Sequence, residues 1–189
     1  MIDTLERVEI DSEEALWEWL SIHYNRQESF LLVTWKKADK DRYVSRDQVL
    51  DALLSYGWID GRRYALDEVK TMQLICQRQQ QKWTKTYRER VEKLTKRGLM
   101  KPAGIAAVNE AKSKGTWMAL QDVDNLEEPR DLLNALQHQN GLDWWSNTAP
   151  SYRRNILRWL SSAKKEETRH KRCQQIASAC GVGQKIKNL

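Results

Sequence analysis

Hydrophobic and polar positions follow two different periods along the chain, and each period predicts one type of element. Apolar residues recur at helical intervals over residues 12–24, directly after Asp11, which has the spacing of an N-cap residue. The run 30–35 is continuously apolar and rich in β-branched residues, which predicts a buried strand. A capping box that opens at Ser45 predicts a second helix, and Gly57 is expected to end it.

The next stretch has the period of strands. Two short strands are predicted over residues 58–66 and 69–77. In the second strand, Met72, Leu74 and Cys76 alternate with polar residues, so these three side chains are expected to share one apolar face. Together with the earlier strand, the pattern predicts a small antiparallel sheet.

The helical period returns after residue 82 and continues to the end of the chain. Further helices are predicted from Trp83 to Gly98, from Pro102 to Gly115, from Pro129 to Asn140, from Pro150 to Ala163 and from 166 to 180. The stretch 121–128 is acidic and is expected to be an irregular connector. The fold class is therefore α+β and predominantly helical, with an α+β part over residues 1–120, a helical C-terminal unit over 126–182 and a flexible tail over 183–189.

Composition adds a cellular setting to this pattern. The start of the chain has no basic and apolar leader, and no run of about 18 apolar residues occurs, so we expect a cytoplasmic protein without a membrane span. The cysteines Cys76, Cys173 and Cys180 lack the close-paired spacing of metal or redox sites. We therefore expect them to be small hydrophobic residues of the core.

The net charge of +6 is distributed unevenly. Residues 1–77 carry 10 basic and 15 acidic side chains, whereas residues 78–101 carry 9 and 2. Residues 102–147 carry 3 and 7, and residues 148–189 carry 10 and 2. If the two basic blocks meet in space, the protein presents a basic face that suits an anionic partner.

Several short motifs occur in a fixed order along the chain. They are Gly57–Gly61, Arg78 and Trp83 before a helix, Gly98–Gly104, Ser151–Arg154 and Ala163–Arg169. In order and spacing these motifs resemble the YdeI/OmdA family of bacterial proteins, which are described as bacteriocin-protection or OmpD-associated. The chain departs from that pattern at Gln77 and Lys82, beside the segment most suited to binding.

The resemblance implies a role in protection against bacteriocins and cationic antimicrobial peptides, and it identifies no reaction and no catalytic residue. A basic protein would repel a cationic peptide. We therefore expect the protein to act through an anionic partner.

The candidate binding residues are arginines and lysines of the two basic blocks, together with aromatic residues near them. The guanidinium fork of arginine binds carboxylate or phosphate in a bidentate manner, which predicts an anion-binding surface. Its candidate residues are Trp58, Asp60, Arg62, Arg78, Trp83, Arg153, Arg154, Lys164 and Arg169. Two structural interpretations remain open: the Gly57–Gly61 segment as a tight turn anchored by a core tryptophan, and the charged residues as solvated helix faces.

Catalysis and metal binding find no support in the sequence. There is no Gly-x-Ser-x-Gly elbow and no phosphate-binding glycine-rich loop, and His23, His138 and His170 lie in no triad or metal pattern. We predict no catalytic residue, no cofactor and no metal site. The alternative function is nucleic-acid binding by the two basic, aromatic-containing helices. The oligomeric state and the identity of the ligand are open.

Overall fold

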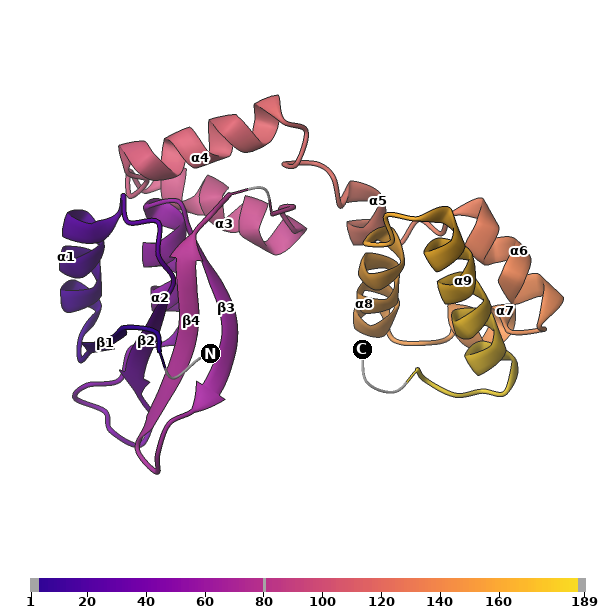
Figure 1. The fold of residues 1–189 in the computed structure, drawn as a ribbon, viewed down its shortest axis with the longest axis horizontal. Helices are drawn as coiled ribbons and strands as arrows, with labels where there is room; N and C mark the ends of the chain where they lie inside the picture. The colour runs from indigo at the N-terminus through magenta and orange to yellow at the C-terminus, as the bar shows by residue number, and fades with distance from the viewer. Residues whose placement is uncertain (1–3, 80, 187–189) are drawn as a thin grey trace. The chain divides into compact units, whose positions relative to one another are not determined.

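The computed structural model describes residues 4–79 and 81–186, which form two compact units, Met1–Met118 and Ala119–Leu189. About 50% of the chain is helical and 14% is strand, so the predicted α+β, predominantly helical class is confirmed. The ribbon of each unit is drawn in Figure 1.

The sheet of the first unit has four strands in the order β1-β2-β4-β3. The strands are β1 (Arg7–Ile10), β2 (Phe30–Trp35), β3 (Trp58–Ala65) and β4 (Lys70–Gln77). β2, β4 and β3 pair in antiparallel fashion, as predicted. The short strand β1 was not predicted, and because it pairs with β2 in parallel, the sheet is mixed.

Four helices accompany this sheet: α1 (Glu13–His23), α2 (Arg46–Ser55), α3 (Lys85–Lys96) and α4 (Pro102–Ser113). The Ser45 capping box at the start of α2 is present, as predicted. At α1 the prediction of Asp11 as the N-cap residue was wrong by one position. Ser12 caps the helix, because its hydroxyl accepts the backbone N–H of Ala15 at 3.1 Å.

The first unit has two hydrophobic clusters that share α2. One joins α1, α2 and the sheet and includes Leu20, Phe30 and Trp58. The other joins α2 with α3 and α4 and includes Leu54 and Trp83, and Figure 1 shows α3 and α4 beside each other near the end of β4. The start of α3 also reaches the sheet, because the hydroxyl of Tyr87 donates to Asp60 of β3.

The regular elements that the structure describes in the second unit are helices, and α9 contacts α6, α7 and α8. Its helices are α5 (Gln121–Asp124), α6 (Arg130–His138), α7 (Leu142–Ser146), α8 (Pro150–Ser161) and α9 (Glu166–Gly181). The stretch 121–128 is not wholly irregular as predicted. Its first four residues form the one-turn helix α5. In this helix Val123 faces the core of the unit, and the acidic residues Asp122 and Asp124 occupy the first turn, where the helix dipole favours them.

The core of the second unit contains Trp145 and the cysteines Cys173 and Cys180, which are free and buried as predicted. The predicted flexible tail includes Ile186, whose backbone N–H donates to the Tyr152 hydroxyl at 3.0 Å. Residues 187–189 of that tail lie outside the described residues.

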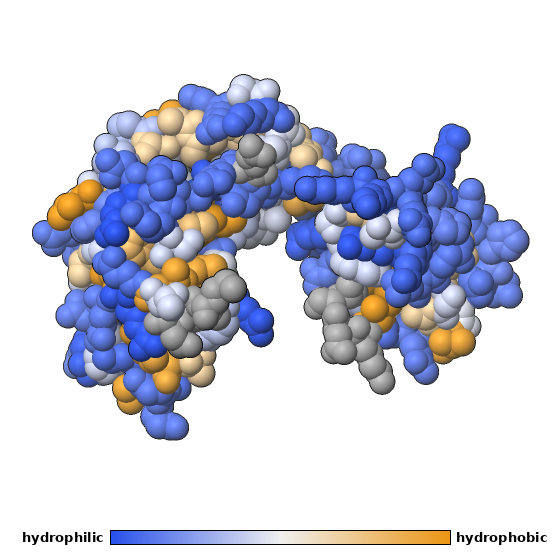
Figure 2. Space-filling model, in the orientation of Figure 1, coloured by the Kyte–Doolittle hydropathy of each residue, from blue (hydrophilic) through white to orange (hydrophobic). Residues whose placement is uncertain are grey.

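Few large hydrophobic side chains of the described residues are exposed. On the face drawn in Figure 2, hydrophilic residues predominate on both units and hydrophobic residues occur in small groups. Large exposed hydrophobic side chains such as Ile22, Ile105 and Val182 are far apart in sequence. Within the described residues, no helix is long and apolar enough to cross a membrane.

Candidate functional site

The nine candidate binding residues divide between the two units. Trp58 and Trp83 belong to the core of the first unit. Trp58 is fully buried, and its indole N–H donates to the carbonyl of Tyr24 at 3.0 Å. Trp83 is 1% exposed and packs against Trp117, with ring centroids 4.9 Å apart. The structure therefore favours the interpretation of Trp58 as the core anchor of a turn, and it leaves one face of Trp83 for Arg78.

Arg78 is a buried cation, only 6% exposed. Its guanidinium carbon lies 3.8 Å from the ring centroid of Trp83 and 4.9 Å from that of Tyr87. One nitrogen, Nη2, donates to the carbonyl of Lys82 at 3.2 Å, whereas Nε and Nη1 have no hydrogen-bond partner among the described residues. Burial lowers the pKa of Arg78 to about 10. A buried arginine with two unpaired donors is expected to be costly unless an acceptor binds there.

Asp60 lies at the centre of a chain of hydrogen bonds beside Arg78. Its carboxylate accepts the hydroxyl of Tyr87 at 2.5 Å and the amide of Gln73 at 3.0 Å. The carbonyl oxygen of Gln73 in turn accepts a guanidinium N–H of Arg63 at 2.7 Å. Burial, followed by the contact with Asp60, raises the pKa of Tyr87 above its ordinary value, so the phenol remains a hydrogen-bond donor.

A cavity of about 210 Å³ opens beside this chain, between α2, the sheet and the start of α3. Its lining includes Arg46, Asp47, Asp60, Gln73, Thr86 and Arg90. Sequence reasoning singled out Asp60 here but missed Arg46, Gln73 and Tyr87. Gln73 was assigned to the polar side of its strand, opposite Met72, Leu74 and Cys76. In fact Gln73 and Ile75 are the buried positions of β4, because Asp60 and Arg63 satisfy the Gln73 amide.

The other candidate arginine of the first unit, Arg62, is exposed, and its guanidinium lies 5.5 Å from the ring of Tyr64. The neighbouring Arg63 is better placed, because its side chain reaches Gln73 and its Nε is buried without a partner among the described residues. The register of β3 against β4 shifts between Asp60 and Arg63. This irregularity separates the exposed position of Arg62 from the position of Arg63, which reaches Gln73.

In the second unit the candidate arginines have internal partners. Arg153 on α8 donates to Glu128, which also accepts the indole N–H of Trp145 at 3.1 Å. Arg154 donates to the carbonyl of Asp124 at 3.4 Å. The fourth candidate of this unit, Lys164, is exposed.

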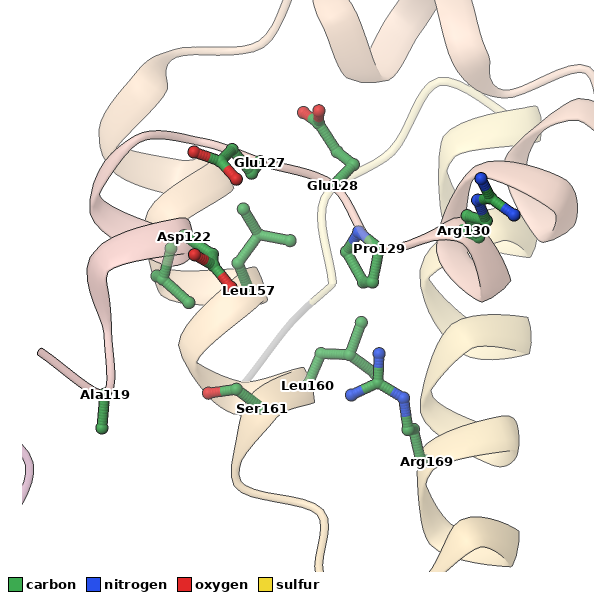
Figure 3. Close-up of a pocket in the computed structure, with 11 residues that line it drawn as sticks. Ala119, Asp122, Glu127, Glu128, Pro129, Arg130, Leu157, Leu160, Ser161 and Arg169 are labelled. Atoms are coloured by element: carbon green, nitrogen blue, oxygen red, sulfur yellow. The ribbon is translucent and has the colours of Figure 1, made fainter. Parts of the chain in front are cut away.

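Arg169 on α9 binds Asp131 through two nitrogens, at 2.6 and 3.0 Å. It also lines a groove of about 390 Å³, drawn in Figure 3. Leu157, Leu160 and Pro129 lie in the middle of this groove, with the Asp122 and Glu127 carboxylates on one side and Arg169 on the other. Three carboxylates, Asp122, Glu127 and Glu128, line the groove together with Arg130 and Arg169, so the groove has no surplus of positive charge.

A second groove of about 590 Å³ brings His138, His170 and Cys173 together beside Asp131 and Arg169. Sequence spacing did not reveal this arrangement. Burial and the nearby Asp131 raise the pKa of Cys173 to about 11, whereas a thiol nucleophile needs a lowered pKa. Among residues 4–79 and 81–186, no group of three or more His, Cys, Asp or Glu side chains could hold a metal ion.

Comparison with known families divides the chain near the boundary between the two structural units, which lies between Met118 and Ala119. Residues 8–107 match the family described as Domain of unknown function (DUF8412), and residues 125–183 match the family described as Bacteriocin-protection, YdeI or OmpD-Associated (OmdA). The first match covers more than half of the chain, so the chain belongs to the DUF8412 family. The second confirms the resemblance to the YdeI/OmdA family for the C-terminal unit. No curated protein and no solved structure matches the chain significantly.

Proposed function

We propose that this member of the DUF8412 family, which carries an OmdA unit, contributes to protection against bacteriocins or cationic antimicrobial peptides as a cytoplasmic binding or sensing protein. In this proposal it catalyses no reaction and acts by binding an anionic ligand on an arginine- and tryptophan-lined surface. The description of the OmdA family supports the protective role. The anion-binding part rests on the first unit.

The observation that carries the proposal is the environment of Arg78. A guanidinium that is buried against Trp83 and Tyr87, with Nε and Nη1 unpaired among the described residues, is suited to receive a carboxylate or phosphate oxygen. Residues that serve a ligand are often unfavourable for the folded protein without it. Arg78 fits that description better than the internally paired Arg153 and Arg169.

Charge also favours an anion over a cationic peptide as the direct ligand. The whole chain carries a net charge of +6, and the two units share it equally, with 21 basic and 18 acidic residues in the first and 11 and 8 in the second. Neither unit therefore attracts a cationic peptide by its net charge. Protection would follow from an anionic ligand that reports on, or takes part in, the response to the peptide.

A thermal-shift series tests the proposal. The ligands are phosphate, succinate, a nucleotide, short oligonucleotides and a cationic peptide, each at low and moderate salt. A ligand present at about a hundred times its dissociation constant adds roughly 2.7 kcal/mol of stability, which corresponds to a shift on the order of 5 to 10 °C for a chain of this size. The proposal expects a salt-resistant shift with an anion, and tight binding of the cationic peptide at moderate salt would contradict it.

Nucleic-acid binding is the second candidate, and the lysines of α3 are the observation that favours it. Lys93 and Lys96 are exposed, whereas Arg90 on the same helix and Arg97 at its C-cap turn to Asp51 of α2. Exposed lysines suit phosphate contacts that depend on counterion release. An oligonucleotide affinity that falls steeply between low and moderate salt would place this candidate first.

A further inference from the structure

We infer that the first unit contains a site for a small dianionic oxyanion, such as a phosphate group or a short dicarboxylate, formed by Arg46, Arg63 and Arg78 around Asp60. This inference rests on the proposed function and assigns to it a location, two further arginines and a class of ligand. The site lies between α2, the β3–β4 pair and the start of α3, at the cavity of about 210 Å³ that Arg46 and Asp60 line. Arg63 and Arg78 do not line this cavity, and the charge of Asp60 acts on both of them.

The charges around the cavity leave the arginines short of carboxylates. Arg90 binds both Asp47 and Asp51, at 2.6 Å to the latter, and Arg97 lies 3.7 Å from Asp51. The carboxylates of α2 are therefore neutralised by α3. Asp60 lines the cavity with Arg46 and is the carboxylate whose charge acts on both Arg63 and Arg78, so one carboxylate faces three arginines, a surplus of two positive charges.

Asp60 forms no described ion pair with these arginines, and each of its oxygens already accepts one hydrogen bond. One accepts the Tyr87 hydroxyl and the other accepts the Gln73 amide. The neutral partners hold the carboxylate in place between the arginines, and no ion pair between Asp60 and any of the three occurs in the part of the chain that the structure describes.

Unpaired donors accompany this surplus of charge. The Nε of Arg63 and the Nε and Nη1 of Arg78 are buried without a partner among the described residues. Arg46 is exposed, lines the cavity and has no described ion pair. Burial, and after it the charge of Arg46, lowers the pKa of Arg63, so these two guanidinium groups repel each other. An anion between them would relieve the repulsion and provide an acceptor for the Nε of Arg63.

The size of the cavity limits the ligand. Drug-sized ligands occupy pockets of roughly 300 to 1,000 Å³, so a cavity of about 210 Å³ suits a phosphate group or a short dicarboxylate rather than a nucleotide or a polymer. Thr86, in the first turn of α3, also lines the cavity, so the positive end of that helix dipole adds to the attraction. By contrast, the groove of the second unit in Figure 3 has no surplus of positive charge.

The test uses the full chain and isothermal titration with phosphate, with succinate and, as a monoanion reference, with chloride at matched ionic strength. The variants are Arg46→Gln, Arg63→Gln and the control Arg7→Gln, which removes the same charge from an exposed position of β1. Each variant is first checked for an unchanged fold by circular dichroism. Arg46→Gln preserves the test if Arg63→Gln folds poorly, because Arg46 is exposed.

We expect phosphate or succinate to bind the wild type, and each site variant to bind about tenfold more weakly while the control keeps its affinity. If the wild type binds the dianion and both site variants keep that affinity, the assigned site is wrong while the proposed function stands. If phosphate, succinate and all other anions fail to bind the wild type, the proposed function fails together with the site. Equal responses to dianions and chloride would also overturn the inference.

Discussion

Replacing Arg153 by methionine tests whether this candidate residue serves a ligand or the fold. Methionine keeps most of the length of the side chain but removes the guanidinium that donates to Glu128. Both side chains of the pair are 18% exposed, and Glu128 also accepts the Trp145 indole N–H. The substitution therefore leaves a largely buried carboxylate with one of its two described donors.

The size of the effect follows from this geometry. A hydrogen bond to a charged group contributes roughly 1.5 to 3 kcal/mol, and breaking a buried ion pair by removing one partner costs about 3 to 5 kcal/mol. Residual exposure of the pair favours the lower range, so we expect a loss of about 2 to 3 kcal/mol. For a unit of this size that loss lowers the melting temperature by roughly 10 to 20 °C.

Differential scanning calorimetry of the full chain measures this loss. Arg154→Met is the matched control on the same helix, because the hydrogen bond that the described residues give Arg154 is a 3.4 Å contact with a backbone carbonyl, and it should cost well under about 1 kcal/mol. The double variant Glu128→Gln with Arg153→Met should recover most of the stability, since glutamine leaves no buried charge. An unchanged melting temperature for Arg153→Met, combined with weaker anion binding, would refute the assignment of Arg153 to the fold.

Three further predictions concern packing, pH and thiol chemistry. Gly104→Ala should destabilise the first unit by about 1 to 3 kcal/mol or more in urea unfolding, because a Cβ at this position would overlap the carbonyl oxygen of Ser55; an unaffected midpoint would contradict this. Hydrogen bonds from Arg169 lower the pKa of Asp131, so the stabilisation by this pair is present at neutral pH and is lost as the pH falls below roughly 4. The variant Asp131→Asn should flatten this acid part of the profile of melting temperature against pH. Burial raises the pKa of Cys173 and Cys180 to about 11, so both thiols should resist a thiol-specific reagent at pH 8 until the protein unfolds, and rapid native labelling would contradict their burial.

Most helices and the three longer strands could be predicted because their signals are local. Capping residues, proline near the first turn and a clear period act within a few positions of the chain. The strand β1 lacks such support, since Arg7–Ile10 alternates over only four residues. The one-turn helices α5 and α7 are too short for a helical period. The buried face of β4 was misassigned because Gln73 is polar, and its burial depends on Asp60 and Arg63 in another strand.

The candidate site was harder to predict because pairing between distant charges is not visible in sequence. The partners of Arg153 and Arg169 lie 25 and 38 residues earlier in the chain, so nothing near either arginine indicates that its charge is neutralised. The same reasoning explains why Arg46 was missed. Its importance comes from the neutralisation of the α2 carboxylates Asp51 and Asp47 by Arg90, which lies 39 and 43 positions further along the chain.

The most direct test of the account follows the arginine Nε–H signals by ¹H–¹⁵N NMR while phosphate is added at constant ionic strength. We predict that the signals of Arg46, Arg63 and Arg78 shift with one saturable affinity, while those of Arg153 and Arg169 do not move. Saturable shifts at Arg153 and Arg169 with none in the first unit would place the anion elsewhere and contradict the account. Small shifts spread over all arginines would also contradict it, because they would indicate screening without a formed site.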